Sequence, residues 1–379
     1  MKNSWWGMPR KITDIIDDRK ISWLELFSDL VYVVIIHGFV ENLSTHFTLT
    51  GFISFWTLFL FIFNTWNNMV LFFDLHGGNN LRNTFFALLQ IIAIGFTATF
   101  TPAYFNGHYT GFIIFYTFNQ LIYMYLFLLT MLSDPEHAIT TRPFLIAYLI
   151  GEIIFVGSIF APNIGVQRIM ILISLLIFIG FVMFERNNFN REFNNRGIPF
   201  TITPAIMERY GLFTMIVFGE SLAGLIEHGE NLHHISEYAL FLVLLLSVIA
   251  IWFVYYTFMD RLKIKAKSYG PLSFFRGLHR LFITCLILQS FFIAQLFEES
   301  ERVFYIGYLI VTIILLLILF AMQRLRIFNP HPLQWKVAIL FPLTAICLLV
   351  LTYFPILLGL LIAVIMLFII AVSGWLFNV

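Results

Sequence analysis

The sequence predicts an all-α, polytopic integral membrane protein, and three observations support this prediction. First, 60% of the 379 residues are hydrophobic and only 11% are charged, whereas soluble domains contain about 45–50% apolar and about 25% charged residues. Second, long apolar runs recur along the whole chain. Third, Lys and Arg are distributed unevenly between the segments that connect these runs. A soluble enzyme or a soluble binding domain is therefore excluded.

The apolar runs predict the number of transmembrane helices. A spanning helix needs about 20 mainly apolar residues. Twelve such runs lie at 23–40, 50–73, 84–104, 109–132, 143–161, 166–184, 207–226, 237–259, 278–297, 302–323, 335–351 and 354–377. The first, fifth and eleventh runs are short. We therefore predict about twelve membrane spans.

The basic residues predict the orientation of the chain. Lys and Arg accumulate in the cytoplasmic loops of membrane proteins. When the N-terminus is placed inside, only Arg168 and Arg302 of the 22 basic residues fall on the outer side. We therefore predict that both termini are cytoplasmic.

The two halves of the chain resemble each other. The segment ELFSDLVYVVIIHG from Glu25 matches ERYGLFTMIVFGES from Glu208, and WNNMVLFFD (66–74) matches WFVYYTFMD (252–260). We predict a cytoplasmic or interfacial segment at 1–22, a six-helix repeat at 23–184, a cytoplasmic linker at 185–206 and a second six-helix repeat at 207–379. An even number of spans in each half makes the two repeats parallel.

Ionisable residues inside the predicted spans mark the candidate site, because a charge at the centre of a spanning helix costs about 2.5–3.5 kcal/mol on insertion scales. Glu25, Asp29 and His37 share about one third of the surface of the first span, at 100° per residue. The seventh span carries a comparable set. Together they predict a transport pathway formed by Glu25, Ser28, Asp29, His37, Glu208, Arg209, Glu220 and Ser221. Secondary candidates are Glu152, Asn67, Asp74, Asp260 and His279.

Structural roles for the same residues stay open at this point. Arg209 could form a salt bridge with a loop or with the other half. Glu25 could snorkel to the interface or pair with Arg209. His37 could donate to a backbone carbonyl of a neighbouring helix. Glu220 has no cation near it in the sequence, so it needs a distant partner or a proton.

No metal or cofactor is predicted. The only cysteines, Cys285 and Cys347, lie in apolar runs and form no zinc motif. The loop EHGENLHHISE (227–237) lacks the regular ligand spacing of a closed metal site. The basic loop DRLKIKAKSYG (260–270) is predicted to determine topology, and we expect no binding of nucleic acid.

Two motifs carry a resemblance to a known family. The segment WLELFSDLVYVV (23–34) resembles the opening motif of the bacterial low temperature requirement A (LtrA) proteins, and ERYGLFTMIVFGESL (208–222) resembles their most recognisable internal motif. Similar segments occur at 82–94, 252–260 and 277–283. The resemblance covers roughly residues 20–300 and implies a multi-pass protein of the bacterial plasma membrane. The family name describes a growth requirement and implies no reaction.

A second resemblance is limited to three residues. Phe27, Ser28 and Asp29 resemble the Phe-Ser-Asp motif at the start of the pore helices of endolysosomal potassium channels. The seventh span has Tyr210, Gly211 and Leu212 at the corresponding place, so only one half of the chain carries the motif.

These observations favour a membrane transport protein, a secondary transporter or an ion channel, with protons or cations as candidate coupling ions. Its expected partners are the lipid bilayer and a small solute or ion, and the sequence leaves homo-oligomerisation open. One alternative is a non-catalytic membrane factor for growth at low temperature. Another is an intramembrane lipid-modifying enzyme, but HExxH, Gly-x-Ser-x-Gly and DDxxD motifs are all absent from the sequence. We therefore predict no enzymatic activity.

Overall fold

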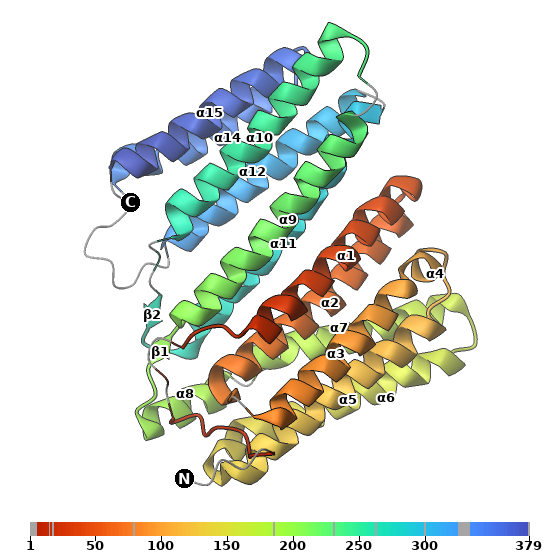
Figure 1. Ribbon diagram of the computed structural model, residues 1–379, viewed down its shortest axis with the longest axis vertical. Helices are drawn as coiled ribbons and strands as arrows, with labels where there is room; N and C mark the ends of the chain where they lie inside the picture. The colour runs from red at the N-terminus through yellow and green to blue at the C-terminus, as the bar shows by residue number, and fades with distance from the viewer. Residues whose placement is uncertain are drawn as a thin grey trace. The chain divides into compact units, whose positions relative to one another are not determined.

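The chain folds mainly into long helices in the computed structural model (Figure 1). The structure describes residues 6–14, 16, 19–78, 80–184, 186–229, 232–260, 262, 264–298, 301–324 and 334–377. It divides into two compact units. The first consists of Met1–Arg209 and Lys267–Ser273, and the second of Tyr210–Ala266 and Phe274–Val379.

The first unit contains the helices from α1 to α8 and the start of α9. Their bounds are α1 Trp23–Thr45, α2 Leu49–His76, α3 Leu81–Thr99, α4 Thr101–Phe105, α5 Thr110–Ser133, α6 Ala138–Gly157, α7 Ile164–Phe184, α8 Arg186–Arg196 and α9 Pro204–Gly229. Short 3₁₀ helices lie at Pro135–His137 and Ser158–Phe160, and the two-residue β-strand β1 lies at Phe200–Thr201. Helix α6 packs on α5 and α7, and α3 packs on α1 and α5.

Local sequence explains where these helices begin. Ser22 caps α1, since its hydroxyl accepts a hydrogen bond from the backbone N–H of Glu25, whose carboxylate in turn accepts from the backbone N–H of Ser22. Thr48 and Asn80 cap α2 and α3 in the same way. Pro102 lies in the first turn of α4, where its missing N–H is tolerated, so the predicted run 84–104 is divided into α3 and α4.

Aromatic side chains fill the core of the first unit. The ring of Phe61 lies 4.8 Å from Tyr116 and 5.1 Å from Phe155, measured between centroids, and Tyr148 lies 4.1 Å from Phe144. Large apolar side chains also cover the outside of the helices, Leu30 and Ile153 among them. Contiguous exposed apolar surface of this kind is typical of a lipid-facing exterior.

The second unit contains the remainder of α9 and the helices that follow it, except that the first five residues of α11, Tyr269–Ser273, belong to the first unit. Their bounds are α10 Ile235–Met259, α11 Tyr269–Glu298, α12 Arg302–Arg324, α13 Trp335–Ala338, α14 Leu340–Leu351 and α15 Ile356–Leu376. The two-residue β-strand β2 lies at Lys265–Ala266. Helix α10 runs along α15 (Figure 1). Gly374 allows this approach, because a Cβ at that position would lie 2.7 Å from the ring of Phe258.

The all-α membrane fold predicted from the sequence is confirmed. Every predicted apolar run falls on a helix. Within the described residues, 11 helices are long and apolar enough to span a membrane, and the stretch Trp335–Leu351 is a shorter apolar helix. The total of twelve spans, the parallel repeats and the predicted domain boundaries stay predictions.

Candidate functional site

A group of four charged residues, three of them buried, lies where α1 meets the start of α9. Arg209 Nη2 lies 2.5 Å from Asp29 Oδ1, and its Nε donates to Asp29 Oδ2 at 3.2 Å. Its Nη1 donates to Glu25 Oε2 at 3.2 Å. Arg19 Nη2 lies 2.8 Å from both carboxylate oxygens of Glu25. We call Arg19, Glu25, Asp29 and Arg209 the charged cluster, and all four belong to the first unit.

The charged cluster is formally neutral and well hydrogen-bonded. Its two carboxylates face two guanidinium groups, and Trp66 Nε1 donates a further hydrogen bond to Asp29 at 2.8 Å. The side chains of Asp29 and Arg209 are only 2% and 3% exposed. Desolvation of buried ions costs several kcal/mol for each ion, and such a site is stable only when every charge is paired. The observed pairing meets this condition.

The spacing of Glu25 and Asp29 on α1 places the two carboxylates of the charged cluster together. Glu25 and Asp29 are one helical turn apart and share a face. His37 lies about 80° further round the helix, and the structure places it on the exposed side of α1. On α9, Arg209 is buried and the adjacent Glu208 is exposed. The structure therefore brings Glu25, Asp29 and Arg209 together but leaves His37 and Glu208 outside the cluster.

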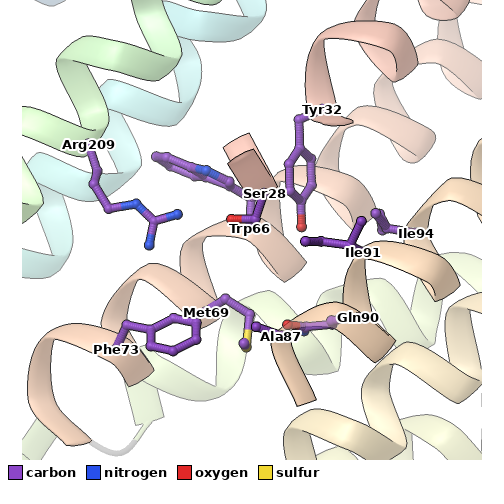
Figure 2. Close-up of a pocket in the computed structure, with 10 residues that line it drawn as sticks. All are labelled: Ser28, Tyr32, Trp66, Met69, Phe73, Ala87, Gln90, Ile91, Ile94 and Arg209. Carbon is purple, nitrogen blue, oxygen red and sulfur yellow. The ribbon is translucent and has the colours of Figure 1, made fainter. Parts of the chain in front are cut away.

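A small cavity adjoins the charged cluster. Its volume is about 20 Å³, and its lining consists of Ser28, Tyr32, Trp66, Met69, Phe73, Ala87, Gln90, Ile91, Ile94 and Arg209 (Figure 2). Figure 2 shows Arg209 and Gln90 on different sides of this space. Gln90 is buried, and its Nε2 forms no hydrogen bond within the described part of the chain. Because a water needs roughly 10–15 Å³, the cavity can hold one water or an ion of similar size.

A second polar group lies where the end of α5 and the start of α6 meet α8, and the sequence did not predict it. His137 Nδ1 lies 2.7 Å from Glu192 Oε1, and Thr140 donates to Glu192 Oε2 at 2.6 Å. Arg196 donates to Glu192 at 3.1 Å and to Asp134 at 2.9 Å. These residues, which we call the α8 anchor, attach the polar helix α8 to the bundle. No local pattern could have revealed it, since its partners lie on helical segments that are far apart in the sequence.

The secondary candidate Asp74 belongs to neither group. Its carboxylate accepts a hydrogen bond from Thr203 at 2.8 Å, and its backbone carbonyl accepts one from Arg10. His76 accepts at its backbone carbonyl from the N–H of Arg10, at 3.1 Å. Asp74 therefore ties the N-terminal segment and the segment before α9 to the end of α2.

Two other secondary candidates lie within the first unit. Glu152 is buried on α6, and Thr117 donates to its Oε2 at 2.9 Å, whereas its Oε1 forms no hydrogen bond among the described residues. Asn67 is buried on α2. Neither lines the cavity.

The remaining candidates lie in the second unit. Glu220 and Ser221 are buried on α9, and the hydroxyl of Ser221 contacts that of Ser290 on α11. His279 is fully buried, with its Nε2 2.9 Å from the hydroxyl of Tyr255. Asp260 is exposed at the C-terminal end of α10.

A scan against protein-family models identifies the family. The model described as bacterial low temperature requirement A protein (LtrA) matches residues 20–372. The chain belongs to the LtrA family. No curated protein and no solved structure matches it.

The LtrA match includes most of the residues discussed above. Glu25, Asp29 and Arg209 of the charged cluster lie inside it, and Arg19 is the residue immediately before it. Among the described residues, no group of three or more His, Cys, Asp or Glu side chains is arranged to hold a metal ion.

Proposed function

We propose that this LtrA-family protein is a membrane transport protein, a secondary transporter or an ion channel, with a polar pathway that passes the charged cluster at α1 and the start of α9. The observation that carries the proposal is the buried contact of Arg209 with Asp29 and Glu25. Charged residues within spanning helices usually face the interior of the bundle or a water-filled cavity and mark the path of an ion or substrate.

The hydrogen bonds of the charged cluster allow its partners to exchange. Glu25 accepts from both Arg19 and Arg209, so one guanidinium can leave while the other still compensates the carboxylate. Asp29 would likewise keep the hydrogen bond from Trp66. When Arg209 moves away, Asp29 loses the guanidinium that compensates it, so opening of the cluster requires a proton or a permeating cation to take the place of that guanidinium.

The cavity supports a pathway that starts beside the charged cluster. It is lined by Arg209 and by the unsatisfied amide of Gln90, so polar groups face it from two different helices. Its volume of about 20 Å³ suits one water or a small ion and is far below the roughly 300–1,000 Å³ of a site for an organic ligand. An ion therefore fits the site better than an organic solute.

Flux into proteoliposomes tests the proposal. Purified protein is reconstituted, and proton and potassium fluxes are measured for the wild type, for Asp29→Asn and for the control Glu208→Gln, whose carboxylate is exposed outside the charged cluster. The proposal expects flux in the wild type and the control and a loss of flux in Asp29→Asn, with a melting curve showing that the variant is folded. Equal flux in all three proteins and in protein-free vesicles would contradict it.

A further inference from the structure

The second unit contains a group of uncharged polar side chains buried among α10, α11 and α12. Ser247, Gln289, Tyr308 and Thr312 are each at most 2% exposed. The hydroxyl of Tyr308 lies near the side chains of the other three, although none of them meets the distance and angle of a hydrogen bond to it. We call these four residues the oxygen cluster, and none of them belongs to the pathway predicted from the sequence.

The oxygen cluster contains more hydrogen-bond acceptors than donors. Ser247 uses its hydroxyl proton on the backbone carbonyl of Leu244, at 2.6 Å, and Thr312 uses its own on the carbonyl of Tyr308, at 2.8 Å. Both hydroxyl oxygens therefore present only lone pairs to the interior of the cluster. Gln289 Nε2 donates to Thr312 Oγ1 at 3.1 Å, which leaves Gln289 Oε1 as a further acceptor.

Two buried oxygens of the cluster lack hydrogen bonds altogether. Within the described residues, neither Gln289 Oε1 nor the hydroxyl of Tyr308 has a hydrogen-bond partner. A buried polar atom without a partner costs about 1–3 kcal/mol. The proton of Tyr308 can satisfy at most one of the acceptors around it. Once that proton is used, lone pairs without a donor remain on the other oxygens of the cluster.

We propose that Ser247, Gln289, Tyr308 and Thr312 form a binding site for a monovalent alkali cation. Hard cations take oxygen ligands, and hydroxyl, amide carbonyl and backbone carbonyl oxygens are ligands of this class. The set is neutral, which suits an ion of single charge, as in filters that replace the hydration shell of an ion with neutral oxygens. A divalent ion would need carboxylate ligands to balance its larger charge.

A water molecule is the competing occupant, because its two protons could satisfy two of the acceptors. The two occupants make different predictions, since water is present in every buffer and an alkali cation is not. The cation site does not depend on the transport proposal, because binding to the intact protein is measured directly.

The experiment measures thermal melting of the full-length protein in detergent, at constant chloride and ionic strength, in sodium, potassium, lithium or choline chloride. Binding to the folded state alone stabilises it in proportion to RT ln(1 + [L]/Kd). We expect the melting temperature to rise with the concentration of at least one alkali cation, by an amount on the order of a few degrees near saturation.

Matched variants locate the effect. Gln289→Met removes Oε1 while keeping the side-chain volume. Ser247→Ala is the second cluster variant and replaces Gln289→Met if Gln289→Met does not fold. Gln323→Met is the control, because Gln323 is also a buried glutamine whose Oε1 forms no hydrogen bond within the described part of the chain, but it donates to the carbonyl of Phe258 outside the oxygen cluster. Binding of radioactive sodium or rubidium gives a second readout.

The expected result is a cation-dependent rise in the wild type and the control that is absent in the cluster variants, with affinity for the ion reduced by about tenfold or more. Equal melting of the wild type in alkali and choline salts overturns the proposal and assigns the space to water. A rise that persists in both Gln289→Met and Ser247→Ala also overturns it, because the ion then binds elsewhere.

Discussion

Arg209 donates to both carboxylate oxygens of Asp29, through Nε at 3.2 Å and with Nη2 at 2.5 Å. This bidentate contact is the geometry that a planar guanidinium forms with a carboxylate. It fixes the relative orientation of the two side chains as well as pairing their charges. It joins two residues that are 180 positions apart in the sequence. The stability of the first unit and the proposed gate both depend on it.

Removal of the guanidinium should therefore destabilise the protein strongly. Arg209→Gln leaves Asp29 and Glu25 buried with one cation fewer, and breaking a buried pair in this way costs about 3–5 kcal/mol. Arg209→Lys keeps the charge but loses the bidentate contact, so an intermediate loss of stability is expected. Thermal melting in detergent measures both. If Arg209→Gln melts like the wild type, the buried pairing described for this site is wrong.

The indole of Trp66 should contribute a smaller and separable amount. Trp66→Phe removes the donor to Asp29 and keeps most of the ring, so a loss of about 1–3 kcal/mol is expected. Trp252→Phe is the matched control, since its indole donates only to the sulfur of Met215, a weak acceptor. The prediction fails if the melting temperatures of the two variants decrease by the same amount.

Two buried glutamines should respond in opposite ways to the same substitution. Gln90→Met removes an amide nitrogen that has no partner among the described residues, so stability should stay the same or rise. Gln120→Met removes a donor 2.6 Å from the hydroxyl of Tyr116, so stability should fall. If Gln90 serves the pathway, its variant loses flux without losing stability. A fall in the melting temperature of Gln90→Met would instead indicate a structural role.

The α8 anchor should hold α8 against the bundle. Glu192→Gln weakens the contacts with His137 and Arg196, so amide hydrogen exchange in α8 should accelerate while exchange in α5 and α6 stays unchanged. Glu136→Gln is the control, because Glu136 is 79% exposed and lies 3.6 Å from Arg196. Equal exchange in α8 of the wild type and Glu192→Gln would show that other contacts hold this helix.

The helices and part of the candidate site could be predicted from the sequence. Apolar runs mark spanning helices directly, because the bilayer requires long uninterrupted apolar segments. The spacing of Glu25 and Asp29 placed both on one face of α1, and the cost of burying Arg209 pointed to an acidic partner. These inferences depend only on local periodicity and on the cost of charge in lipid.

The remaining contacts depend on tertiary structure. His137 and Glu192 are 55 residues apart and no repeat relates them, so only the packing of α8 against the start of α6 brings them together. His37 lies on the same helix as the cluster, yet a rotation of about 80° is enough to place it on the exposed side. The oxygen cluster gave no signal, because single Ser, Thr and Gln residues are common on membrane helices and most of them bond to their own backbone or pack against neighbours.

The most direct test of the central claim is the access of water to α1, because it requires no knowledge of the cargo. In a background with Cys285→Ala and Cys347→Ala, Ser28→Cys places a thiol at the cavity and Leu30→Cys places one on the exposed apolar face of the same helix. Labelling in membranes with a charged thiol reagent, which reacts with thiolates in contact with water, compares the two positions. The account predicts that Ser28→Cys is labelled and Leu30→Cys is not. Labelling of Leu30→Cys alone, or equal labelling of both, would contradict a polar pathway along α1.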